Sequence, residues 1–184
     1  MSAAPALDAS RPAPLRLAGF LLAVVGALLV GIGVVTTWAT VGIGGENIHT
    51  DIPGVDLPDG KVALGCAVVM LVGILATRMV RSGRAAAAWS GLVIAVGVIA
   101  MAIGGAFLVT GLDRSAVVAS LPPREFWDAV GAFEDLGTGA ILVLLGGVLG
   151  FCGGIASLAW AMRGRDAEVP PAEDAVGSDP AAPA

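Results

Sequence analysis

The chain has 184 residues, of which 57% are hydrophobic and only 14% are charged, and its mean hydropathy is +0.89. Soluble domains carry about 25% charged residues, so this composition excludes an ordinary soluble protein. The formal charge of −5 at pH 7 argues against a nucleic-acid partner, because binding to a phosphate backbone requires clustered lysine and arginine.

Four long apolar stretches dominate the sequence. A membrane-spanning helix needs about 20 predominantly apolar residues. The second apolar run is shorter, but Arg78 at its end can extend its charged group to the membrane surface. We therefore expect an all-α membrane protein, a four-helix antiparallel transmembrane bundle formed by residues 15–162. The predicted spans are approximately residues 17–37, 62–80, 85–110 and 139–162.

Two tails flank this domain. Residues 1–14 are rich in alanine and proline, and residues 163–184 are acidic and rich in the same two residues. Both are predicted to be disordered, because they cannot bury enough apolar surface to offset the entropy of ordering. A cleaved signal peptide is the alternative for the first span. Its apolar run of about 19 residues exceeds the roughly 7–15 of a signal peptide, so we expect an uncleaved span.

The arginines define an orientation. Positive residues near span ends mark the cytoplasmic side of a membrane. This rule predicts a multi-pass protein of the plasma (inner) membrane with both termini in the cytoplasm and two long, mainly acidic loops outside. Seven of the nine arginines agree on this side: Arg11, Arg16, Arg78, Arg81, Arg84, Arg163 and Arg165.

The four tryptophans fall near the predicted membrane boundaries. Trp38 and Trp127 are placed at the outer boundary, and Trp89 and Trp160 at the inner one. Tryptophan is enriched at both interfaces of a membrane. We therefore interpret all four as anchors in an aromatic belt.

The two outer loops contain local structural signals. In the first, Thr40–Ile43 and Asn47–Ile52 are predicted to form a short hairpin, since Gly-Gly and Pro-Gly pairs punctuate this segment. In the second, Arg124–Leu136 has Phe126, Val130 and Phe133 at helical spacing. This pattern predicts an amphipathic helix on the outer membrane surface.

Glycine spacing is ordered in the fourth span. Lipid provides no hydrophobic drive for helix association, so helices approach through small residues. The face can pack within its own bundle, or it can bind an identical subunit or another membrane protein. Its members recur every four or seven residues: Gly139, Gly146, Gly150, Gly153 and Gly154.

Chemically active residues are scarce. No Asp, Glu, Lys, Arg or His lies in the middle of a span, which argues against a proton-coupled carrier. The single histidine, His49, has no nucleophile near it in sequence, and general base catalysis needs such a group. We therefore predict no catalytic, cofactor or metal site, and a protein that is not an enzyme. We expect the surfaces of its spans to contact membrane lipid.

One stretch resembles a known group. Trp38–Leu64 contains Gly54-Val55-Asp56 and then Asp59-Gly60 before a span, and Gly137-Thr138-Gly139 opens the fourth span, which continues LGGVLGFCGGI. With the near absence of lysine, these features resemble uncharacterised actinobacterial four-span membrane proteins, including the tryptophan-associated set. The resemblance covers most of residues 15–162 and implies location and architecture, not an activity.

Two functions are compatible with these features. The first is a structural or accessory membrane protein that interacts with another membrane or envelope component. The alternative is an extracytoplasmic divalent-cation-responsive sensor or small transport component that uses Asp51, Asp56 and Asp59. Calcium binds several oxygen ligands from flexible loops, although the spacing here matches no EF-hand.

Overall fold

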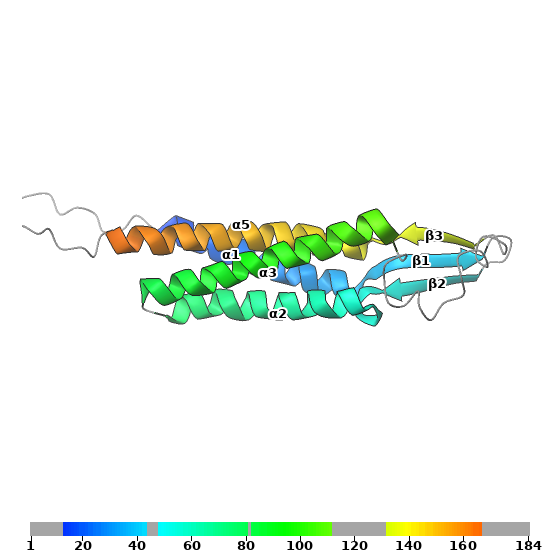
Figure 1. Cartoon of the computed structure of the whole chain (residues 1–184), viewed down its shortest axis with the longest axis horizontal. Helices are drawn as coiled ribbons and strands as arrows, with labels where there is room; N and C mark the ends of the chain where they lie inside the picture. Colours follow the sequence, from blue (N-terminus) through cyan, green and yellow to red (C-terminus); the bar gives the residue numbers. More distant parts are fainter. Residues whose placement is uncertain (1–12, 44–47, 81, 112–131, 167–184) are drawn as a thin grey trace, which may run out of the picture.

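The computed structural model describes residues 13–43, 48–80, 82–111 and 132–166, and this part of the chain is mostly helical. Each of its four long helices is long and apolar enough to cross a membrane. This finding confirms the four predicted spans and indicates a multi-pass membrane protein. The helices are α1 (Ala13–Val35), α2 (Pro58–Met79), α3 (Gly83–Thr110) and α5 (Thr138–Asp166) (Figure 1).

The helix ends differ slightly from the predicted tail boundaries. Helix α1 begins at Ala13, and α5 continues to Asp166, so both helices enter segments predicted to be disordered. The remaining tail residues lie outside the described part of the chain. The helices therefore extend two residues into the predicted N-terminal tail and four residues into the predicted C-terminal tail. A helix can continue past the end of its apolar run.

Helix α5 packs against both α1 and α3. Along α1, Gly19 meets Gly153 and Ser157, whereas Gly33 meets Gly139. Residue numbers rise on one helix as they fall on the other, so α1 and α5 run in opposite directions. Helix α2 lies against α1 and α3, and Figure 1 shows all four helices side by side along one long axis.

Three strands form an antiparallel sheet at one end of the helices (Figure 1). They are β1 (Thr37–Ile43), β2 (Ile48–Pro53) and β3 (Ala132–Leu136), in the order β2-β1-β3. The β1–β2 pair confirms the predicted hairpin, with β1 beginning earlier than expected. The described part of the chain is mostly helical, as predicted, and the small three-stranded sheet is an addition to the all-α class.

The predicted surface helix is wrong over its last five residues. Ala132–Leu136 is strand β3, and it pairs with β1 in a register that places Val41 opposite Glu134. The first part of the predicted helix, residues 124–131, lies outside the described residues. Helical spacing of apolar residues gave no sign of this pairing, because β1 lies far away in the sequence and supplies the backbone hydrogen bonds.

The sheet is joined to the helices by backbone hydrogen bonds. The Gly137 N–H donates to the Trp38 carbonyl at 2.7 Å, and the Gly54 N–H donates to the Thr36 carbonyl at 3.2 Å. Gly54 opens a short 3-10 helix, η1 (Gly54–Asp56), which leads into α2. Strand β1 follows directly after α1, and strand β3 leads directly into α5. These connections and hydrogen bonds fix the sheet to the two helices.

Candidate functional site

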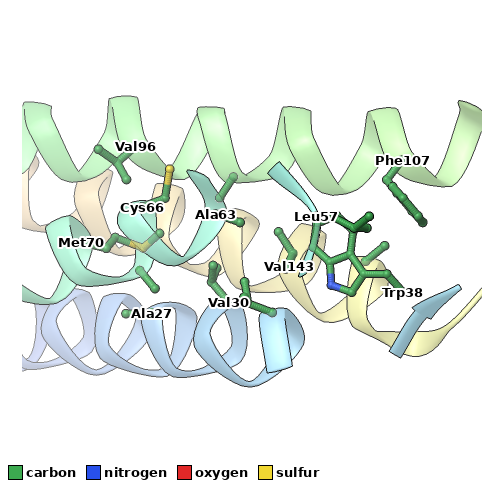
Figure 2. Packing of buried hydrophobic residues seen from close by; sticks show 14 of the residues in the cluster. Ala27, Val30, Trp38, Leu57, Ala63, Cys66, Met70, Val96, Phe107 and Val143 are labelled. Carbon is green, nitrogen blue, oxygen red and sulfur yellow. The ribbon is translucent and has the colours of Figure 1, made fainter. Parts of the chain in front are cut away.

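Trp38 closes the helices at the end that carries the sheet. Its side chain is fully buried, and its indole Nε1 donates a 2.8 Å hydrogen bond to the Gly33 carbonyl. The Phe107 ring meets it edge to face, with centroids 4.9 Å apart. Figure 2 shows Trp38 beside Leu57, Phe107 and Val143. The aromatic-belt interpretation of Trp38 is wrong, because the indole lies in the core.

The interior below Trp38 is apolar. Figure 2 shows Val30, Ala63 and Met70 between the helices. Two of the buried hydroxyls bond to their own helices: Thr77 donates to the Ile74 carbonyl at 2.6 Å, and Ser90 donates to the Ala86 carbonyl at 2.9 Å. Both hydroxyl hydrogens are therefore used within their own helices, and neither is available to donate to a water or ion in the interior.

The glycines of α5 face other helices of the same chain. A methyl group at Gly146 would lie 2.6 Å from the Gly26 carbonyl oxygen, and one at Gly153 would lie 2.7 Å from the Gly19 carbonyl oxygen. Gly150 faces Met70 of α2, and Gly154 faces α3. This arrangement is the first of the two interpretations, packing within the bundle. Binding of a second subunit through the same glycine face stays a prediction.

The aspartates whose side chains the structure describes lie on the sheet, in η1 and at the start of α2. Asp51 accepts a 2.7 Å hydrogen bond from Thr40 Oγ1, and Asp135 lies opposite Thr40 on the other side of β1. Residues directly opposite each other share one face of a sheet. Asp51, Thr40 and Asp135 thus form a row, which we call the acidic row, and both of its carboxylates are exposed.

The residues of the cation alternative do not form a metal cluster. Across the described ranges, no group of three or more His, Cys, Asp or Glu side chains could hold a metal ion. Asp51, Asp56 and Asp59 are all exposed, and Glu46 lies outside the described residues. His49 lies on β2 opposite Gly42.

A small, open cleft lies at the opposite end, near the start of α1 and the end of α5. Its enclosed space is about 10 Å³, room for a single water molecule, and the surrounding free space, open solvent included, is about 250 Å³. Two arginines in it sit over aromatic rings. Arg16 Cζ is 4.6 Å from the centroid of Trp160, and Arg78 Cζ is 4.3 Å from that of Phe20. We call it the arginine cleft, and its lining residues are Arg16, Phe20, Thr77, Arg78, Ala86, Ser90, Ser157 and Trp160.

The arginine cleft joins residues that the sequence analysis treated separately. Arg78 was predicted only to reach the membrane surface, and Trp160 only to anchor the chain. The hydroxyls of the cleft had no predicted role. A sequence signal existed, because arginine and aromatic residues recur at the same predicted depth in three spans, but only helix packing shows that they converge.

Comparison of the sequence with known protein families and with curated proteins finds no match.

Proposed function

We propose that this chain is a non-catalytic structural or accessory protein of the plasma membrane. Its four helices form an antiparallel transmembrane bundle with both termini in the cytoplasm. The outer sheet binds another membrane or envelope component. The observation that carries this proposal is the fixed position of the sheet. Strand β1 continues from α1 and β3 leads into α5, and these two helices pack closely through glycine.

The sheet has two different faces, which supports a role in binding. Val41 and Ile52 pack against the hydrophobic core, whereas Asp51 and Asp135 are exposed on the alternate face. Successive residues of a strand point to opposite faces, so one face can hold the sheet on the bundle while the other meets a partner. The chemistry of the acidic row favours a partner with a basic surface.

The orientation rests on charge. Arg16, Arg78, Arg84 and Arg163 lie at the helix ends away from the sheet, whereas Asp51, Asp56, Asp59 and Asp135 lie on the sheet or at the adjacent start of α2. Excess positive charge near span ends marks the cytoplasmic side, so this separation supports a sheet on the outer face.

The proposal is tested by purifying the tagged protein from its native membrane in mild detergent and identifying bound proteins by mass spectrometry. We expect a stoichiometric partner that is lost in Asp51→Asn/Asp135→Asn and retained in the control Arg84→Gln. Retention in both variants, or a protein that purifies alone, would contradict binding through the acidic row.

The cation-responsive alternative makes a separate prediction. If Asp56 helps to bind calcium or magnesium, millimolar concentrations of either ion should raise the unfolding temperature, and Asp56→Asn should remove the increase. An unfolding temperature that is indifferent to both ions would rule this alternative out.

A further inference from the structure

We propose that the open mouth of the arginine cleft binds the phosphate of an anionic phospholipid headgroup from the adjacent membrane leaflet. This site is independent of the outer sheet. Its proposed ligand groups are the guanidinium groups of Arg16 and Arg78 and the hydroxyl of Ser157, which come from α1, α2 and α5 and line the same space.

Among the side chains that the structure describes, no carboxylate lies at the end of the helices where Arg16 and Arg78 meet. Arginine remains protonated in proteins. The carboxylates whose side chains the structure places, Asp51, Asp56, Asp59 and Asp135, belong to the sheet and the adjacent start of α2. None of them can neutralise Arg16 or Arg78 at the other end of the helices. An anion from outside the described residues would therefore be attracted to the cleft.

Aromatic rings hold both arginines in place. Arg16 sits over Trp160 and Arg78 over Phe20, at 4.6 Å and 4.3 Å from Cζ to the ring centroid. A cation over an aromatic face is attracted to the ring without using up all its hydrogen-bond donors. Arginine presents five N–H groups in a planar fork that fits phosphate oxygens. The rings therefore position the arginines while leaving N–H groups for a phosphate.

Ser157 supplies an independent sign of a polar ligand. Its side chain is only 7% exposed, and its hydroxyl forms no hydrogen bond within the described residues, unlike those of Thr77 and Ser90 in the same cleft. Among those residues no buried side-chain nitrogen or oxygen is both sealed from solvent and unpaired, so the Ser157 oxygen, which lies beside Gly19 of α1 in the wall of the cleft, keeps a small exposed area. Buried hydroxyls are nearly always hydrogen-bonded, and a phosphate oxygen can accept this one.

The depth of the arginine cleft matches a lipid headgroup. The apolar segment Leu17–Val35 lies between Arg16 and the Trp38 end of the bundle. At 1.5 Å per residue it spans ~28 Å, close to the ~30 Å hydrocarbon thickness of a bilayer. Arg16 therefore lies about one hydrocarbon thickness from the end of α1 that leads into the sheet, at the depth expected for lipid phosphates.

The surroundings favour a lipid over free phosphate. Leu21 directly follows Phe20 on α1, and Leu75 stands three residues before Arg78 on α2. Both side chains are about half exposed, at 51% and 45%. Exposed leucines beside the arginine cleft can contact acyl chains while the arginines bind the headgroup. Basic pockets between transmembrane helices on the cytoplasmic side are known to bind anionic headgroups.

The test is native mass spectrometry of the full-length protein with equimolar phosphatidylglycerol and phosphatidylcholine. We expect one phosphatidylglycerol to be retained in preference to phosphatidylcholine. In Arg16→Gln/Arg78→Gln the preference should fall about 100-fold, because two hydrogen bonds from charged groups to the phosphate are lost. Ser157→Ala should weaken binding about tenfold, because it removes a hydrogen bond to a charged group.

The matched control is Arg84→Gln/Arg163→Gln, which removes the same charge from exposed arginines at the same end but outside the arginine cleft. It should keep most of the preference. An equal loss in both double variants would show general surface attraction and overturn the site. Binding of millimolar inorganic phosphate as strong as that of phosphatidylglycerol would overturn the lipid assignment.

A second measurement does not depend on the variants folding. Wild-type protein in vesicles that contain a photoreactive phosphatidylglycerol should be labelled near residues 16–20, 77–90 or 157–160. Competition by unlabelled phosphatidylglycerol, but not by phosphatidylcholine, should reduce this labelling. Uniform labelling along the helices, or equal competition by both lipids, would overturn the proposal.

Discussion

The indole Nε1 of Trp38 donates a 2.8 Å hydrogen bond to the carbonyl oxygen of Gly33, five residues earlier in the chain. This bond turns the indole back under the end of α1 as the chain leaves the helix for β1. The ring then fills the space between α1, η1 and α5, where Gly54 and Gly139 leave room for it. Trp38 thereby joins the sheet to the core of the bundle.

Replacing Trp38 should destabilise the protein strongly. Trp38→Ala should lower the free energy of unfolding by about 3–5 kcal/mol, because it leaves a large cavity. Trp38→Phe should cost about 1–3 kcal/mol, since it removes the donor to the Gly33 carbonyl. Unfolding in detergent, followed by circular dichroism, measures both. The control Trp89→Phe changes a half-buried ring and should have a smaller effect; equal losses at both positions would contradict the role of Trp38.

Two glycines of α1 should respond oppositely to alanine. At Gly26, a methyl group would lie 2.6 Å from both the Gly146 carbonyl oxygen and the Gly150 nitrogen, so Gly26→Ala must push α1 and α5 apart. Overpacking of this kind costs about 1–3 kcal/mol. At Gly31 nothing lies within 4 Å, so Gly31→Ala should be neutral or stabilising by up to about 1 kcal/mol, from helix propensity. Thermal unfolding of both variants checks the packing, and similar midpoints would refute it.

A disulfide can test strand β3. Thr40 and Asp135 are directly opposite in the β1–β3 register, so their Cα atoms should be about 4.5–5.5 Å apart, within the range for a disulfide. Thr40→Cys/Asp135→Cys should crosslink on mild oxidation. In the control Val41→Cys/Asp135→Cys the side chains point to opposite faces, so crosslinking should be poor. Mass spectrometry of tryptic peptides reads out both; no crosslink in the first pair would favour the helix predicted from the sequence.

Labelling of intact cells can test the orientation. Thr50 lies on β2 and is exposed, and Ser82 lies between α2 and α3 and is also exposed. Thr50→Cys should react with a membrane-impermeant maleimide, whereas Ser82→Cys should react only after the cells are opened. The native Cys66 and Cys152 lie within α2 and α5, and the unsubstituted protein measures their background. The reverse pattern would place both termini outside.

The sequence predicted the spans well because the bilayer imposes a simple local requirement. About 20 apolar residues make a spanning helix whatever their partners are, and α1, α2, α3 and α5 meet this requirement. The β1–β2 hairpin could also be predicted from the sequence, because its two strands are neighbours in the chain and turn residues separate them. The same local reasoning failed for Ala132–Leu136, whose partner strand is distant in the chain.

The candidate sites were less predictable than the fold. Trp38 at a span end is typical of an interfacial anchor, and its burial depends on room left by Gly54 and Gly139. Arg16 and Trp160 are at opposite ends of the chain, and only the packing of α1 against α5 brings them together. Sequence spacing describes one helix at a time, so it does not specify which side chains of two helices meet.

By itself, the sequence determined the number of spans and the separation of charge between the two ends of the helices, because hydrophobic length and charge are properties of each segment alone. The tertiary structure decided that the glycines of α5 pack within the chain, that β3 joins the sheet, and that Arg16, Arg78 and Ser157 share one cleft. These features depend on close approach between distant segments, which small residues permit and only the packed chain specifies.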